Sequence, residues 1–153
     1  KGNALKLYND TLKNGKRYEQ GYLKDGDQAA ELIQELGLEI EFAPNTVRLR
    51  KIDDKTFILT LKDKKKSKTR EVEWEIPPKV FKKYWKLTKG ARVYKRRWTT
   101  EVKGFKMEFD AFTDRLLLMV ETEVDKKKLL KAVPKLGMDV TGNSMWSNKS
   151  LSK

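Results

Sequence analysis

Two runs of alternating residues decide the fold: VRLRKI at residues 47–52 and TFILTLK at residues 56–62, joined by an Asp-Asp-Lys turn. Alternation with period two is typical of half-buried strands, and the short polar turn predicts an antiparallel hairpin. Successive side chains of a strand point to opposite faces. We therefore expect the guanidinium groups of Arg48 and Arg50 and the ammonium group of Lys62 to converge on one face of this hairpin.

Composition narrows the chemistry that the chain can perform. A chain of 153 residues fits one domain and can bury about 68–70% of its unfolded surface. Because the chain has no cysteine and no histidine, it cannot use thiol nucleophiles, histidine bases or Ser-His triads, and nearly all zinc sites are excluded. An enzyme of this composition would use carboxylates, amines, guanidinium groups and a hard metal ion.

The charge balance indicates the kind of partner. The 35 Lys and Arg against 22 Asp and Glu give a net charge of +13, which predicts a polyanionic partner or substrate. No apolar run approaches the ~20 residues that cross a bilayer, and the first residues show no signal-peptide pattern. We expect a cytoplasmic protein with no membrane partner, which forms a single domain over residues 1–153 and exists as a monomer or homodimer.

Other segments predict further strands and three short helices. Residues 1–16 are polar and show no clear pattern. Strand patterns occur at residues 17–23, 38–42, 71–76, 91–100, 106–110 and 115–124. Helix patterns begin after Asp25 and end at Gly37, run from Val80 to Leu87, and begin again after Asp125. Seven or eight antiparallel strands with three short helices indicate an α+β fold built on one large sheet.

Nearly every predicted strand has one charged face. The basic residues on these faces are Arg48, Arg50, Lys62, Lys95 and Arg97, and the acidic residues are Glu71, Glu73, Glu75, Glu108, Asp110, Glu121 and Glu123. An open sheet with one solvent-exposed face explains this pattern. A closed barrel with a charged lumen and helices outside explains it equally well, and closure also removes the edge strands.

A charged lumen persists only if opposite charges offset one another or a ligand fills it, because each buried unpaired ion costs several kcal/mol. Separate basic and acidic groups therefore suggest a substrate that brings phosphates and a metal that brings positive charge. Arginine binds phosphate oxygens as a bidentate fork and lysine as a point charge. Paired carboxylates bind Mg²⁺ or Mn²⁺.

The order of these motifs resembles the CYTH family, the triphosphate tunnel metalloenzymes, which include thiamine triphosphatases, inorganic triphosphatases and class IV adenylyl cyclases. The matching segments are Gln20–Leu23, Arg48–Arg50, Leu59–Lys62, Glu71–Glu73, Lys95–Trp98, Glu108–Asp110, Glu121–Glu123, Gly137–Asn143 and Ser147–Leu151. The resemblance covers about residues 17 to 151. It implies a closed antiparallel eight-stranded β-barrel, wrapped by short helices, that hydrolyses or cyclises a triphosphate with Mg²⁺ or Mn²⁺.

The resemblance also assigns roles to residues. As phosphate-binding residues it implies Arg48, Arg50, Lys62, Lys95, Arg97 and Lys149. As metal-side carboxylates it implies Glu121 and Glu123, with Glu108, Asp110 and Glu73 in support. Lys62, Arg97 and Glu121 are the residues expected to take part in catalysis. The acidic face at residues 71–75 could equally be a passive counter-charge for the arginines.

Two departures from the family pattern bear on function. The family's first strand, Glu-x-Glu-x-Lys, is not found before Gln20: either the given chain starts after that strand, or this copy lacks two metal ligands and only binds. Thr69 stands where the family usually has an arginine. The neighbouring Arg70 is displaced by one position and would point to the other face of the strand.

The expected function is metal-dependent hydrolysis of inorganic triphosphate, thiamine triphosphate, or a nucleoside or RNA 5′-triphosphate. The alternatives are an adenylyl cyclase and a non-catalytic module that binds polyphosphate, nucleotide or RNA. No G-x-x-x-x-G-K-[ST] loop occurs in the chain, which argues against a P-loop enzyme.

Overall fold

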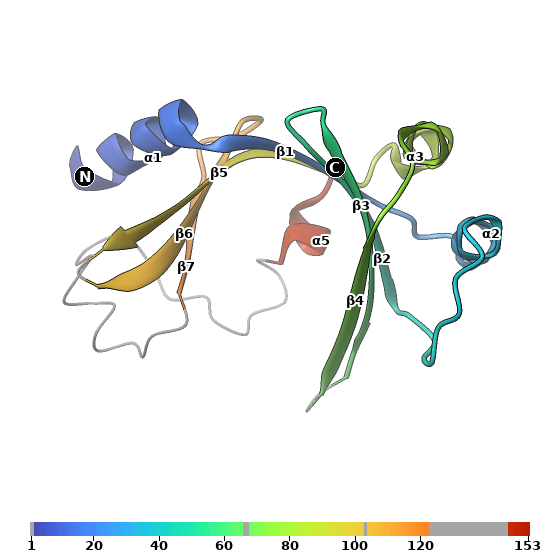
Figure 1. The fold of residues 1–153 in the computed structure, drawn as a ribbon. Coiled ribbons are helices and arrows are strands. Elements are labelled where there is room, and N and C mark those ends of the chain that lie inside the picture. Colours follow the sequence, from blue (N-terminus) through green and yellow to red (C-terminus); the bar gives the residue numbers. More distant parts are fainter. Residues whose placement is uncertain (1, 66–67, 103, 123–146) are drawn as a thin grey trace. The chain divides into compact units, whose positions relative to one another are not determined.

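The computed structural model describes residues 2–65, 68–102, 104–122 and 147–153 (Figure 1). In this part of the chain seven strands form one sheet in the order β4-β3-β2-β1-β5-β6-β7. The strands are β1 (Lys16–Tyr22), β2 (Thr46–Ile52), β3 (Thr56–Lys64), β4 (Thr69–Glu75), β5 (Arg92–Val102), β6 (Phe105–Phe112) and β7 (Leu118–Thr122). The helices are α1 (Gly2–Asn14), α2 (Gly26–Glu35), α3 (Pro78–Trp85) and α5 (Asn148–Leu151), with a 3-10 turn η1 (Lys86–Thr88).

The chain forms two compact units. The first contains residues 1–18 and 94–144, and the second contains residues 19–93 and 145–153. The predicted antiparallel sheet with short helices is confirmed. The eighth strand, the closure into a barrel and the single domain stay predictions. None of the described helices is both long enough and apolar enough to span a membrane.

In the second unit, β2 and β3 form the predicted hairpin, with Leu49 opposite Leu59 and Arg48 opposite Thr60. The turn is tight because Asp53 and Asp54 adopt positive φ values of 50° and 56°, a conformation that Asp reaches more easily than most residues. Helices α2 and α3 lie on one side of these strands (Figure 1). The apolar face of the hairpin packs against these two helices. The opposite face carries Arg48, Arg50 and Lys62.

The core of the second unit explains why Arg48, Arg50 and Lys62 of the hairpin share the face opposite the apolar one. Leu49 and Leu59 are fully buried in a cluster that also contains Leu32 of α2 and Phe81 of α3. Helix α2 begins where the sequence predicts, because the side chain of Asp25 accepts hydrogen bonds from two backbone N–H groups of the first turn. It ends before Gly37, whose φ of 65° provides the left-handed stop.

In the first unit, α1 packs on the β5–β6–β7 sheet. The Tyr8 hydroxyl donates to the Phe112 carbonyl, and the Arg96 guanidinium donates to the Gly15 carbonyl at 3.2 Å. The strand register pairs Arg97 with Asp110. Because side chains alternate along a strand, Arg97 lies on the face opposite Arg96.

Three expectations about secondary structure were wrong. Residues 2–14 form helix α1, and the pattern was missed because Tyr8 and the buried Thr11 occupy positions where apolar residues are expected. Residues 38–42 form no strand: Leu38, Ile40 and Phe42 pack against the core from irregular backbone. The last described strand begins at Leu118 and not at residue 115. The predicted helix after Asp125 lies outside the described residues.

Candidate functional site

Most of the charged side chains of β2, β3 and β4 gather on the sheet face away from α2 and α3, here called the arginine face. It contains Arg48 and Arg50 of β2, Thr60 and Lys62 of β3, and Glu71 and Glu73 of β4. The register places Glu73 opposite Thr60 and Glu71 opposite Lys62. The structure therefore brings together the predicted Arg48, Arg50, Lys62 and Glu73.

Arg48 is the most buried charged group of the arginine face, with 6% of the residue exposed. Its Nη2 donates to the Thr60 hydroxyl at 3.0 Å and to Glu73 Oε1 at 3.2 Å. Its buried Nε–H has no hydrogen-bond acceptor among the described residues. A buried unsatisfied donor costs about 1–3 kcal/mol, so this N–H is suited to donate to an anionic oxygen of a ligand.

Lys62 is held close to Glu71, with 3.6 Å between Nζ and Oε1. Burial lowers the pKa of Lys62 below its ordinary value, and the positive charge of Arg48 lowers it further, whereas Glu71 acts in the opposite direction. The net effect is a lowered pKa, since desolvation and like charge both disfavour the protonated form. A bound polyanion would reverse this shift.

Strand β1 contributes contacts that the sequence did not predict. Arg50 Nε donates to Gln20 Oε1 at 2.8 Å, and Gln20 Nε2 lies 3.5 Å from the Tyr22 hydroxyl. Burial raises the pKa of Tyr22, and the positive charges of Arg48 and Arg50 partly offset this. Gln20 and Tyr22 are 0% and 4% exposed. The sequence feature that could have found Gln20 and Tyr22 is their spacing of two positions in β1, which places both side chains on one face.

Lys149 of α5 reaches the start of β2. Its Nζ donates to the Asn45 carbonyl at 2.8 Å and to the Thr46 hydroxyl at 3.2 Å. Thr46 shares its side of β2 with Arg48. The structure therefore places Lys149 beside the arginine face, and phosphate binding by its ammonium group stays a prediction.

The first unit has its own charged face, formed by Lys95 and Arg97 of β5, Glu108 and Asp110 of β6, and Glu121 of β7; we call it the acidic face. Arg97 binds Asp110 with both Nε and Nη2, at 2.8 and 2.9 Å. Lys95, whose side chain is 0% exposed, is 2.7 Å from Asp110. Arg97 also lies 3.2 Å from Glu108. The structure thus brings Lys95, Arg97, Glu108 and Asp110 together in this unit, and their roles in binding stay predictions.

The ion pairs of the acidic face set the charge state of its residues. Burial raises the pKa of Asp110, but the hydrogen bond from Arg97 and the charges of Lys95 and Arg97 outweigh it, so the net pKa lies below the usual value. Burial lowers the pKa of Arg97, and Asp110 more than offsets this. In the free protein Asp110 is thus a counter-ion for two cations. Phosphate would compete with it for Arg97.

We tested whether the described carboxylates fit a metal ion. They form no group of three or more that could hold one, and Glu123 lies outside the described residues. Glu108, however, lies directly opposite Glu121 in the β6–β7 register, where like charges are destabilising. Mg²⁺ is usually bound by one or two carboxylates together with substrate phosphates and water. Glu108 and Glu121 fit that mode.

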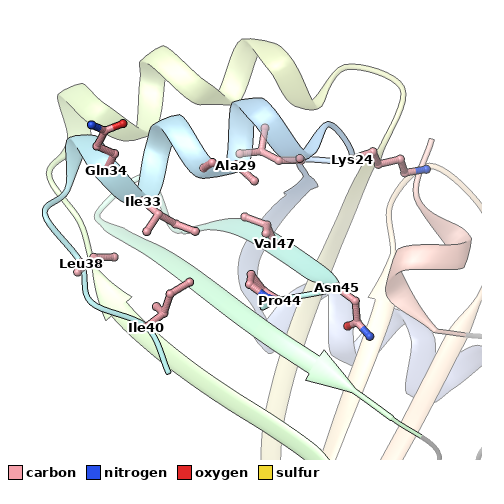
Figure 2. A pocket seen from close by; sticks show the side chains of 12 residues that line it. Lys24, Ala29, Ile33, Gln34, Leu38, Ile40, Pro44, Asn45 and Val47 are labelled. Carbon is pink, nitrogen blue, oxygen red and sulfur yellow. The ribbon is translucent and has the colours of Figure 1, made fainter. Parts of the chain in front are cut away.

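The helix side of the second unit carries an apolar pocket of about 520 Å³ (Figure 2). Ala29 and Ile33 of α2 and Val47 of β2 line it, and Lys24 and Asn45 are among its polar lining residues. Val47 points to the face opposite Arg48. Because its described lining offers one amine and no carboxylate, the pocket is unsuited to a metal–triphosphate complex.

Comparison with solved structures agrees with the fold inferred from the motifs. The chain is similar to the crystal structure of the inorganic triphosphatase NE1496, with a TM-score of 0.60, 23% identity, and coverage of 91% of this chain and 83% of that one. It is equally similar to a structure of the hypothetical protein NE1496, with a TM-score of 0.59, 26% identity, and coverage of 91% and 85%.

These similarities confirm that the chain has the fold of a triphosphatase structure, as the motif resemblance implied. No protein-family model matches the chain, and no curated protein sequence matches it significantly. Activity, substrate and metal dependence are therefore argued from the residues.

Proposed function

We propose that the protein is a metal-dependent triphosphate hydrolase, and that inorganic triphosphate is its first substrate to test. The observation that carries the proposal is the arginine face, where Arg48 presents a buried Nε–H that lacks an acceptor among the described residues. The similarity to the inorganic triphosphatase NE1496 supports the choice of substrate. Thiamine triphosphate and nucleoside or RNA 5′-triphosphates share the same group and are tested beside it.

In this proposal the arginine face binds the phosphate chain. Arg48 and Arg50 provide planar forks that match phosphate oxygens, and Lys62 provides a point charge. Preorganised cations in a partly buried site stabilise the charge that builds up on a transferred phosphoryl group. In the first unit, Arg97 could bind phosphate oxygens only by exchanging Asp110 for them.

Glu108 and Glu121 would hold the Mg²⁺ or Mn²⁺ ion, which would neutralise charge on the phosphate oxygens. Glu121 has no hydrogen bond or ion pair with another described residue, in contrast to Glu108, which lies 3.2 Å from Arg97. We propose that the Glu121 carboxylate orients the attacking water.

Removal of divalent metal should stop hydrolysis. We expect tripolyphosphate to release phosphate with Mg²⁺ or Mn²⁺ and not with excess EDTA, because the proposed metal ion neutralises charge on the phosphate oxygens. Phosphate release measured colorimetrically checks this, and added Mg²⁺ should restore the rate. Full activity in EDTA would contradict the metal dependence.

Binding of tripolyphosphate should take up protons at alkaline pH. The pKa of Lys62 is lowered in the free protein, below its ordinary value of about 10.4, and a bound polyanion favours the protonated amine. Proton uptake is therefore expected between the lowered and the restored pKa. Calorimetric titrations at several alkaline pH values, in buffers of different ionisation enthalpy, measure it. Lys62→Met should remove this uptake, and an unchanged uptake would assign the proton elsewhere.

A second candidate is a module that binds polyphosphate without hydrolysing it. The absence of a three-carboxylate group from the described residues favours it. Tight binding of tripolyphosphate with no phosphate release under any metal condition would establish this alternative. Release of pyrophosphate from ATP would instead indicate the cyclase reaction.

A further inference from the structure

We infer that β1 is a positioning strand, in which Tyr18, Gln20 and Tyr22 orient the guanidinium groups of the proposed phosphate-binding arginines. The inference rests on the proposed function, because it assigns these arginines to a triphosphate. The three residues alternate along β1 and therefore share one face. Each of them contacts an arginine of its own compact unit.

In the second unit, Gln20 and Tyr22 form a buried relay between two arginines. Gln20 Oε1 accepts from Arg50 Nε at 2.8 Å, and Gln20 Nε2 lies 3.5 Å from the Tyr22 hydroxyl. The Tyr22 hydroxyl in turn lies near Arg48, whose positive charge opposes the rise in the pKa of Tyr22 on burial. An amide and a phenol are neutral acceptors, so these contacts fix the guanidinium planes without neutralising the positive charges.

In the first unit, Tyr18 contacts Arg97 through its ring. The guanidinium carbon of Arg97 lies 4.9 Å from the centre of the Tyr18 ring, within the range of a cation–π interaction. The ring covers one side of the planar group, while Asp110 binds its edge. Tyr18 thus sets the plane in which Arg97 can present its donors.

Orientation matters because a guanidinium binds phosphate through donors in a fixed plane. An arginine that rotates freely must lose side-chain freedom when the ligand binds, and this weakens binding. Neutral positioning contacts remove that cost in advance. Loss of one should therefore weaken anion binding more than it changes stability.

The first test compares two buried tyrosines. Tyr22→Phe removes the hydroxyl that contacts Arg48; the control, Tyr84→Phe, removes a hydroxyl that donates to Glu35 at 3.0 Å from a residue that is 1% exposed. Calorimetry with metal-free tripolyphosphate should show affinity weakened about tenfold by Tyr22→Phe, the value for a hydrogen bond to a charged group, and unchanged by Tyr84→Phe. Equal affinities in both variants would overturn the role of Tyr22.

The second test adds a charge without changing shape. Gln20→Glu keeps an oxygen beside Arg50 but supplies a carboxylate that competes with phosphate, so we expect at least tenfold weaker binding. Gln34→Glu changes the net charge equally at an exposed site on α2 and should leave affinity within about twofold. If Gln20→Glu also binds like the wild type, Gln20 does not position Arg50.

The third test uses conservative rescue at Tyr18. Tyr18→Phe keeps the ring and should retain affinity, whereas Tyr18→Leu should weaken it by about fivefold. In the free protein, the ¹⁵N–¹H signal of Arg97 Nε should broaden or shift in the leucine variant only. Wild-type protein that binds no tripolyphosphate would refute the proposed function. Wild-type protein that binds, with Tyr18→Leu, Tyr22→Phe and Gln20→Glu unchanged, would refute only this inference.

Discussion

Replacing Arg48 by alanine should reduce kcat/KM for tripolyphosphate by about 10²–10³-fold, the loss typical of one preorganised donor to a developing oxyanion. Arg48 is 6% exposed, and its buried Nε–H is the donor left without an acceptor in the described part of the chain. Arg48→Lys keeps the charge but loses the planar fork, so its activity should lie between those of the wild type and the alanine variant. Phosphate release at saturating and limiting substrate measures both variants.

The control for this substitution is Arg96→Ala. Arg96 carries the same charge, but it donates to the Gly15 carbonyl on the α1 side of the first unit. Its removal should leave kcat/KM within a few-fold of the wild-type value. If both alanine variants lose activity equally while their melting temperatures remain similar, net charge and not the arginine face would explain phosphate recognition.

Replacing Asp110 by asparagine should destabilise the first unit by about 3–5 kcal/mol, the cost of leaving a buried charge without its partner. Lys95 has a side chain that is 0% exposed and pairs with Asp110 at 2.7 Å, and Arg97 binds the same carboxylate twice. Urea unfolding measures the change. The control, Asp114→Asn, removes a pair with Arg115 that is more exposed and should cost less than about 1 kcal/mol.

The same carboxylate predicts a specific dependence of stability on pH. Because the pKa of Asp110 is lower in the folded protein than its ordinary value, of about 3.9, its ionised form stabilises the fold above that value. This contribution is lost as the pH falls toward the lowered folded pKa. As the pH falls below 5, the Asp110→Asn variant should therefore lose less of its stability than the wild type loses. Urea unfolding midpoints at several pH values measure this. Parallel pH curves would contradict the assignment.

The sequence was most informative where local pattern and burial agree. The hairpin of β2 and β3 was predicted because alternation there reflects a sheet with one apolar and one charged face, and Leu49 and Leu59 are fully buried while Arg48 meets Glu73. The sequence placed Arg97 and Asp110 on charged strand faces, but it did not predict their pairing, which follows from the register of β5 and β6.

The sequence was least informative where tertiary contacts decide. Helix α1 uses Tyr8 and Thr11 in place of an apolar stripe, and Tyr8 finds its partner 104 residues away. Residues 38–42 alternate like a strand because their apolar side chains cover the core, although their backbone joins no described strand. Gln20 was recognised only as part of a family segment; its contact with Arg50 spans 30 residues and depends on β1 lying beside β2 in the sheet.

The central claim is that the arginine face binds the phosphate chain, and the ¹⁵N–¹H signal of Arg48 Nε tests it most directly. The signal is assigned with Arg48→Lys, and metal-free tripolyphosphate is titrated into the wild-type protein at constant ionic strength. We predict a large shift that saturates at one equivalent, because the buried N–H gains an acceptor, and no such shift with chloride. An Arg48 signal that stays unchanged while the protein hydrolyses tripolyphosphate would contradict the account.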